Sequence, residues 1–167
     1  TENTEILRLF SDSNAYQPDE SSVSKTSLYD LDDKLIDAYL LKVYGRGRND
    51  FEVTYEKLMQ DLKICDEYGR LTLAGLLYFG KNPQQFKPAF NIKAVAFYGN
   101  DMAGMEYRDS KDLQGTIPSL FDQAMHFLDM NLHHIQAGQN FNSLGILEVS
   151  KVALEEILQN ALIHREY

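Results

Sequence analysis

Three polar side chains form a row on the segment that ends the chain. With about 100° of rotation per residue, Glu156, Asn160 and His164 lie at positions i, i+4 and i+8 of an expected helix. A carboxylate can orient a water molecule as a general base, and a carboxamide oxygen one turn away can ligate Mg²⁺ beside phosphate groups. By spacing alone, a solvated helix face is the simpler interpretation of the same residues.

A second row combines acids and histidines on the segment 117–134. Asp122, His126, Asp129 and His133 stand at i, i+4, i+7 and i+11 of an expected helix, opposite its apolar stripe. Imidazoles and carboxylates on one face can hold Zn²⁺ or another divalent ion. Ligands along a single helix rarely close a tetrahedral site without another element, so two acid–histidine pairs in solvent are the favoured interpretation.

The charge of the chain limits the partners that it can bind directly. Its 167 residues include 16 Lys and Arg against 25 Asp and Glu, and the net charge of −9 opposes the phosphate backbone of DNA or RNA. The basic cluster Arg46 and Arg48 is the candidate for a nucleic-acid phosphate contact. Hydrophobic residues make up 44% of the chain, which is enough for a core and excludes global disorder.

Several familiar motifs are absent from the sequence. It has no P-loop, no Gly-x-Gly-x-x-Gly, no Gly-x-Ser-x-Gly and no Cys-x-x-Cys. A single cysteine, Cys65, excludes an internal disulfide, suits a reducing cytoplasm and is expected to be a buried apolar group. No stretch approaches the roughly 18 apolar residues of a membrane span.

The last helix also carries a family resemblance. Residues 154–167 read LEEILQNALIHREY, and a Glu followed by three residues and Asn-Ala resembles the first motif of GHKL ATPases of the gyrase, histidine-kinase and MutL type. The segment is similar to REALVNALVHRDY in bacterial transcriptional regulators and RecG-related ATP-dependent DNA helicase-like proteins. Residues 66–101, DEYGRLTLAGLLYFGKNPQQFKPAFNIKAVAFYGND, resemble a second passage of that family. The resemblance covers residues 28–167.

This resemblance implies a domain order and a site. Such proteins have a Schlafen AlbA-type domain, a connecting region and a divergent, histidine-kinase-like ATPase domain. Glu156 is thereby implied as the catalytic base or water-orienting residue, and Asn160 as the ligand of Mg²⁺ bound with ATP. The family's later glycine-rich motifs and the AlbA core motifs are absent, and no helicase motor motif is found. The fragment alone is therefore expected neither to bind nor to hydrolyse ATP, which belongs to a full-length parent.

Hydrophobic periodicity predicts the elements that position these residues. Residues 11–27 read as a linker or as an extended strap across a surface. Helices and strands are expected over the following ranges: helices 2–10, 28–44, 54–62, 73–79, 117–134 and 151–164, and strands 90–98 and 106–113.

Caps and turns delimit three of these helices. Asp30 is expected to cap the helix 28–44 and Gly45 to end it, and Thr72 and Gly80 to delimit the helix 73–79. Ser150 is expected to cap the last helix. The inner stripe of the long helix is expected to run from Ile117 to Ile135. The turn 66–70 offers Gly69 for a positive φ.

A helix-turn-helix over 54–62 and 73–79 is disfavoured. The connection is about ten residues, whereas the DNA-binding motif has a turn of three or four. The segment 73–79 offers no side chain suited to reading bases, and we expect it to be buried, with Gly75 allowing close helix packing.

The sequence therefore predicts an α+β fold. A helical subdomain over about 28–80 packs with a small, mainly antiparallel sheet that includes 90–98, and the long helix covers it. The expected domains are 1–27, the tail of an AlbA-like domain with a Ser-rich linker; 28–149, the connecting domain; and 150–167, the first helix of a truncated GHKL-type ATPase domain.

Two function classes follow from these observations. The first is the central fragment of a cytoplasmic, ATP-dependent transcriptional regulator, with DNA bound through other domains, a homo-oligomer as a further partner and no membrane. The alternative is a non-enzymatic protein-interaction or dimerisation module, favoured by the acidic surface, the aromatic content and the lack of a complete site. A direct DNA binder is disfavoured by the charge.

Overall fold

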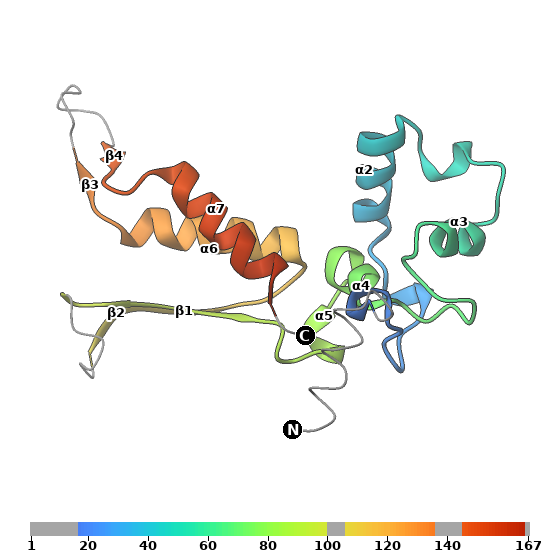
Figure 1. Cartoon of the computed structure of the whole chain (residues 1–167), viewed down its shortest axis with the longest axis horizontal. Coiled ribbons are helices and arrows are strands. Elements are labelled where there is room, and N and C mark those ends of the chain that lie inside the picture. The colour runs from blue at the N-terminus through green and yellow to red at the C-terminus, as the bar shows by residue number, and fades with distance from the viewer. Residues whose placement is uncertain (1–16, 100–105, 136–144, 166–167) are drawn as a thin grey trace. The chain divides into compact units, whose positions relative to one another are not determined.

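The described part of the chain falls into two units. The computed structural model describes residues 17–99, 106–135 and 145–165 (Figure 1). Residues up to Pro88 belong to the first unit and those from Ala89 to the second. Helices together with a small antiparallel sheet confirm the α+β fold class. The helix predicted over 2–10 lies outside the described residues. Among the described residues, no helix is both long and apolar enough to cross a membrane.

Short helices make up the first unit. Its α-helices are α2 (Asp33–Tyr44), α3 (Tyr55–Asp61), α4 (Leu73–Phe79) and α5 (Pro83–Phe86). Three single 3₁₀ turns accompany them at Pro18–Glu20, Leu28–Asp30 and Arg48–Asp50. The first-unit helices predicted from 54 and from 73 are thus confirmed within a residue or two at each end.

The helix predicted over 28–44 begins later than expected. Asp32 is its N-cap and accepts from the backbone N–H of Lys34 at 2.9 Å. The Asp30 carboxylate instead accepts from the backbone N–H of Ser27 at 2.8 Å, so the prediction that Asp30 caps this helix is wrong. Leu31 is held in extended backbone because it forms a bridge with Gly80. The end at Gly45, in the left-handed region at φ +67°, is confirmed.

An extended strap joins the start of the first unit to residues far along the chain. The backbone N–H of Val23 donates to the carbonyl of Leu71 at 2.8 Å, and that of Leu73 donates to the carbonyl of Ser21 at 2.9 Å. The Thr26 hydroxyl accepts from the Leu71 N–H at 2.9 Å and donates to the Val23 carbonyl at 2.6 Å. Residues 11–27 were predicted to be either a linker or an extended strap. The described part of this segment, 17–27, is the extended strap.

Helix α4 lies at the centre of the first unit. The Thr72 hydroxyl caps it, accepting from the Gly75 N–H at 3.0 Å and donating to the Lys63 carbonyl at 2.8 Å. Its predicted burial is confirmed, since Leu73, Gly75, Leu76 and Leu77 are all buried. A buried helix cannot read bases, which agrees with the rejection of a helix-turn-helix. Cys65 is buried as predicted, and that burial raises the pKa of its thiol.

The turn after Cys65 is built around the Asp66 carboxylate. Asp66 accepts from the Ser22 hydroxyl at 2.7 Å and from the backbone N–H groups of Tyr68 and Arg70, each at 2.9 Å. Gly69 has the positive φ predicted for it, +76°. Burial raises the pKa of Asp66, but hydrogen bonds from Ser22, Arg70 and Tyr68 outweigh it and lower the pKa to about 2.

We expect this carboxylate to make the stability of the chain depend on pH. Because the pKa of Asp66 is lower when folded, its contribution is fully present above about pH 4 and is lost as the pH falls toward about 2. Asp66→Asn should lower the free energy of unfolding at pH 7 by about 1–2 kcal/mol, allowing for solvent screening. Urea unfolding of both proteins at pH 7 and at pH 2.5 measures the difference.

Asp61→Asn is the matched control for Asp66→Asn. Asp61 forms an exposed pair with Lys57 at 2.7 Å on one helix, and such pairs contribute about 0.3–0.5 kcal/mol. Equal losses in the two variants would contradict the role given to Asp66.

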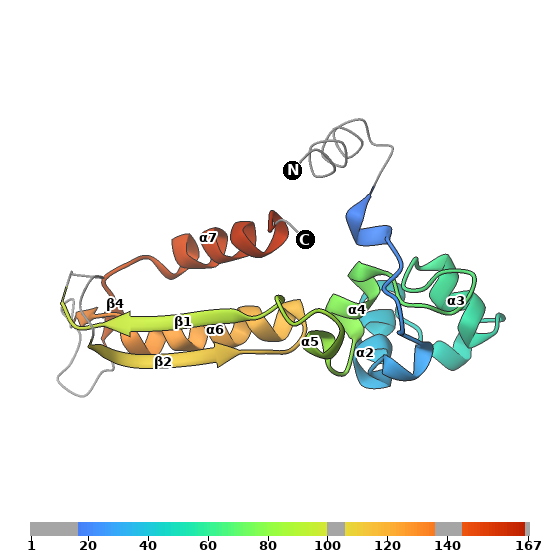
Figure 2. The same ribbon diagram turned by 90° about the horizontal axis from the view of Figure 1, so that it is seen from below.

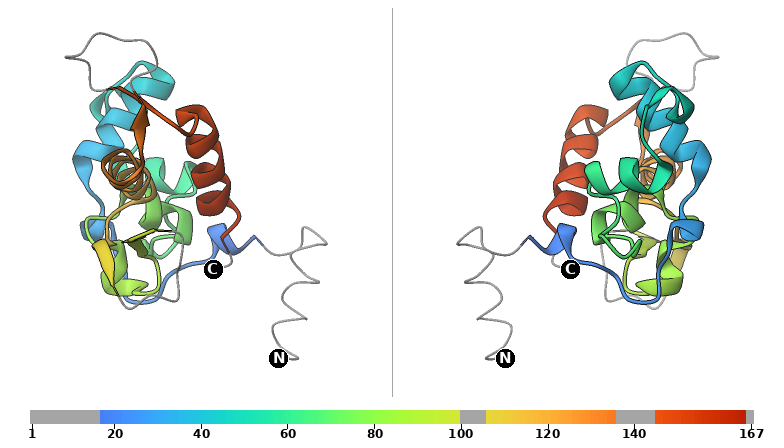
Figure 3. Two further views of the ribbon diagram at one scale, coloured as in Figure 1. Left: turned by 90° about the vertical axis from the view of Figure 1, so that its left-hand side faces the viewer. Right: turned by 90° about the vertical axis from the view of Figure 1, so that its right-hand side faces the viewer.

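The second unit combines two helices with two short antiparallel sheets, β1 with β2 and β3 with β4. Its elements are β1 (Ile92–Phe97), β2 (Tyr107–Leu113), α6 (Ile117–Asn131), β3 (His134–Ile135), β4 (Ile146–Leu147) and α7 (Lys151–Ile163). The strands β1 and β2 are antiparallel with Ile92 opposite Leu113, which confirms both predicted strands. Helix α6 covers one face of this sheet (Figure 2). Seen along its axis, α6 has α7 beside it (Figure 3).

The core of the second unit lies between the sheet and α6. Its buried residues are Leu113, Leu120 and Ala124, and Ile92, Ala94 and Leu158 pack against them. Residues from β1, β2, α6 and α7 thus share one apolar cluster, which explains why the alternation of the strand and the stripe of the helix are both visible in the sequence.

The long helix ends earlier than the sequence predicts. Helix α6 stops at Asn131, whose side-chain amide donates to the Phe127 carbonyl at 3.0 Å, while the Arg108 guanidinium donates to the Asn131 carbonyl. Leu132 follows in extended backbone. Ile135 belongs to β3 and is 46% exposed, so its predicted place on the inner stripe of the helix is wrong.

Candidate functional site

The row predicted on the last helix is presented on the open side of α7. Glu156, Asn160 and His164 are all exposed. Leu154, Leu158 and Leu162 are half-buried or buried on the other side of the helix. His164 follows the last helical residue, and its backbone N–H donates to the Asn160 carbonyl at 2.9 Å. The three side chains of the row are therefore all exposed in the structure, and the third of them, His164, lies just past the end of the helix.

The open side of α7 is also apolar, which the sequence analysis did not identify. Val152 is 70% exposed, Ile157 67% and Ile163 61%. Large aliphatic side chains on both sides of one helix are typical of a helix packed between two layers. The signal was present in the sequence as β-branched residues outside the stripe of Leu154, Leu158 and Leu162.

Chemically, the row offers the beginning of a site. A carboxylate and a carboxamide one turn apart supply two oxygen donors, and Mg²⁺ needs several more from water, phosphate or protein. Across residues 17–99, 106–135 and 145–165, no group of three or more His, Cys, Asp and Glu side chains is placed to hold a metal ion. The row can contribute to a site that other elements complete.

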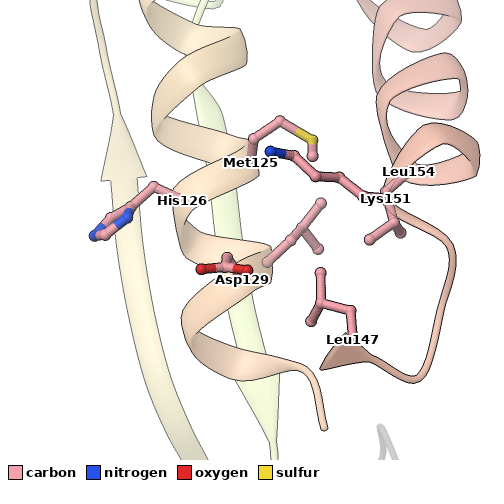
Figure 4. Close-up of a pocket in the computed structure, with 7 residues that line it drawn as sticks. Met125, His126, Asp129, Leu147, Lys151 and Leu154 are labelled. Atoms are coloured by element: carbon pink, nitrogen blue, oxygen red, sulfur yellow. The ribbon is translucent and has the colours of Figure 1, made fainter. Parts of the chain in front are cut away.

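A small cavity lies between α6 and α7, at the start of α7. Its volume is about 230 Å³, and its walls are Met125, His126, Leu128, Asp129, Leu147, Lys151 and Leu154. The Lys151 side chain extends toward Met125, while His126 points to the opposite side of α6 (Figure 4). Glu156 and Asn160 are not among the lining residues, so this cavity and the polar row are separate features.

The acid–histidine row on α6 does not form in the structure. His133 lies beyond the end of the helix at Asn131, so the i+11 position does not exist. Asp129 instead lies 3.7 Å from Nε2 of His134, a residue that the sequence analysis left outside the row. Asp122 and His126 are exposed. The helix end thus accounts for the difference, and the solvent-exposed acid–histidine interpretation fits better than a zinc site.

The charge of Arg48 is already balanced by carboxylates. Its Nη1 lies 2.8 Å from Oδ1 of Asp33, and its Nε lies 3.2 Å from Oδ1 of Asp37. The Tyr55 hydroxyl donates to the same Asp33 oxygen at 3.3 Å. Burial and then Asp33 raise the pKa of Tyr55 to about 12, so it stays a donor at neutral pH. A phosphate group would have to compete with two carboxylates for Arg48. Arg46, the other residue of the predicted contact, is exposed.

A family model matches just over half of the chain. The match covers residues 7–93, and the family is described as Domain of unknown function (DUF8451). It spans most of the first unit and enters β1. No curated protein matches the chain.

A solved structure shares the fold. The crystal structure of the DIP2311 protein from Corynebacterium diphtheriae superposes with a TM-score of 0.56 at 19% identity. The match covers 95% of this chain and 30% of that protein. The chain therefore corresponds to less than a third of the length of the protein that it resembles.

Proposed function

The chain belongs to the family described as Domain of unknown function (DUF8451), and on that premise we propose that it is the connecting region of a larger ATP-dependent transcriptional regulator. In that cytoplasmic protein it links a nucleic-acid-associated domain, through which DNA is bound, to an ATP-binding domain. The observation that carries the proposal is the outward presentation of Glu156 and Asn160 on α7.

Two properties of α7 support a site completed by further elements. The polar pair is exposed, with room for ATP-bound Mg²⁺ at the Asn160 carboxamide and for a water molecule at the Glu156 carboxylate. Beside the pair, Val152, Ile157 and Ile163 offer the apolar surface on which another layer would pack. A polar pair with exposed apolar neighbours on the same helix suits a helix that forms one wall of a nucleotide site better than a helix at a free surface.

Calorimetric titration of ATP with Mg²⁺ into the full-length natural protein tests this proposal. We expect Asn160→Ala to weaken binding at least about tenfold, because it removes an oxygen ligand of the metal. We expect Glu156→Gln to retain binding and to lose any hydrolysis, because the amide cannot act as a base. The isolated chain should bind no ATP, because Glu156 and Asn160 are not enclosed by other described residues.

Gln159→Ala is the matched control for this titration. Gln159 is an exposed neighbour on the same helix but lies outside the polar row. Its replacement should leave the affinity unchanged. Equal affinities of wild type and Asn160→Ala, or no binding by a folded full-length protein, would refute the ATP-linked function.

The exposed apolar residues of α7 favour a second candidate, a protein-interaction or dimerisation module. Apolar side chains that gather on one surface are typical of association sites. This candidate predicts a defined oligomer in sedimentation experiments that does not depend on nucleotide. Ile157→Asp should then convert the oligomer to monomer, with and without ATP.

A further inference from the structure

Arg165 holds the end of α7 against the segment that leads into β1. Its Nη1 donates to the Asn91 carbonyl at 3.0 Å, and its Nη2 donates to the Ala89 carbonyl. Its Cζ atom lies 5.1 Å from the centre of the Phe90 ring. Phe90 is buried, with 6% of its surface exposed, so the guanidinium is seated on a fixed part of the unit.

The chemistry of this contact requires an arginine. The planar guanidinium presents donors on separate nitrogens and reaches two carbonyls at once while lying near an aromatic ring. A lysine ammonium is a point charge on a flexible stem, so it would hold one carbonyl with poorer geometry. Arg165 also stands just after the helix end, where a positive charge is favourable to the helix dipole.

Apolar contacts also hold α7 in the second unit. Leu158 packs against the core of the second unit, and Leu162 is buried with 7% of its surface exposed. The hydrophobic effect is not directional, whereas hydrogen bonds from Arg165 to two fixed carbonyls depend on angle as well as distance, so they add a directional restraint on α7. A rotation would turn Glu156 and Asn160 away from their present direction.

We propose that Arg165 is a positioning residue that fixes the rotation of α7 and thereby the direction in which Glu156 and Asn160 point. The proposal extends the function proposed above, and it rests on that function for its consequence but not for the contact itself. Ala89 is the first residue of the second unit. Arg165 therefore ties the helix that carries the polar pair to the point where the chain leaves the first unit.

Amide hydrogen exchange and residual dipolar couplings of the chain, both measured without nucleotide, test the positioning role. Arg165→Ala should speed exchange of the α7 amides from 159 to 163 about tenfold, the effect of losing one to two hydrogen bonds. The couplings of α7 should then no longer fit the alignment defined by β1 and β2. Arg165→Lys should give exchange rates and couplings between those of wild type and Arg165→Ala, because lysine keeps the positive charge but lacks the second donor nitrogen.

Arg108→Ala is the matched control, since Arg108 also donates to a carbonyl at a helix end in the same unit, that of Asn131. It should leave the exchange and the couplings of α7 unchanged. Unchanged couplings in Arg165→Ala, or full restoration by Arg165→Lys, would overturn the proposal. If Arg165→Ala unfolds the second unit, the test rests on Arg165→Lys, which should change the exchange and the couplings of α7 by a smaller amount without unfolding it. Neither readout involves ATP, so a failure of the ATP-linked function would be seen separately in the titration.

Discussion

Replacing Gly75 with alanine is expected to lower the free energy of unfolding by about 3 kcal/mol. A Cβ atom at this position would lie 2.1 Å from the Ile64 carbonyl oxygen and 2.9 Å from its carbon. That carbonyl is held in place, since it accepts from the Thr72 N–H at 3.0 Å. Alanine therefore forces α4 away from residue 64, and the strap that is bonded to the start of α4 must shift with it. Urea unfolding of the two proteins measures the loss.

Gly47→Ala is the control for this substitution. Gly47 has an ordinary φ of −77°, and a Cβ there would meet Oδ2 of Asp50 at 3.5 Å, a normal contact. Its replacement should change the free energy of unfolding by less than about 0.5 kcal/mol. A Gly75→Ala protein as stable as Gly47→Ala would mean that the close approach of α4 to Ile64 is not present in solution.

Leu120→Ala should destabilise the second unit by about 3 kcal/mol. Leu120 is 1% exposed and lies in the cluster with Leu113 and Ala124, between α6 and the sheet. Truncation leaves a cavity under β1 and also removes support from the half-buried Leu158 of α7. Hydrogen exchange should therefore accelerate in β1, β2, α6 and α7, and remain slow in α4.

Met130→Ala on the same helix serves as its comparison. Met130 is 66% exposed, so its loss should cost less than about 0.5 kcal/mol. Acceleration of exchange in α4 to the same degree as in α6 by Leu120→Ala would contradict the division of the chain into two units with separate cores.

The ends of helices were predictable where a side chain acts locally. Thr72 and Gly80 delimit α4 as predicted, because each makes a local cap bond: the Thr72 hydroxyl accepts from the Gly75 N–H, and the Gly80 N–H donates to the Leu76 carbonyl. The start of α2 was not, because Leu31 and Asp32 lie in extended backbone, where Leu31 forms a bridge with Gly80 and the Asp32 N–H donates to the Phe79 carbonyl at 2.7 Å. Propensity favours helix there, and a long-range bridge overrides it.

The site residues show the same division between local and long-range causes. The row of Glu156, Asn160 and His164 follows from helical period alone and is present on one side of α7. The pairing of Arg48 with Asp33 joins a 3₁₀ turn to a helix through the tertiary fold. The contact of Arg165 with Ala89 and Asn91 spans more than seventy residues, a separation at which no periodicity carries information.

The strap has a consequence for the order of folding. Its bonds join residues 45 positions apart, as between Thr26 and Leu71; just after the strap, the Lys81 ammonium donates to the Tyr29 carbonyl, 52 positions away. Closing such loops costs entropy before any contact compensates for it, which slows folding relative to a purely local helical bundle. During synthesis, residues 21–27 leave the ribosome well before their partners at 71–73. The backbone of the strap therefore stays exposed until the start of α4 has emerged. A chain shortened to begin at residue 28 would lack the strap altogether.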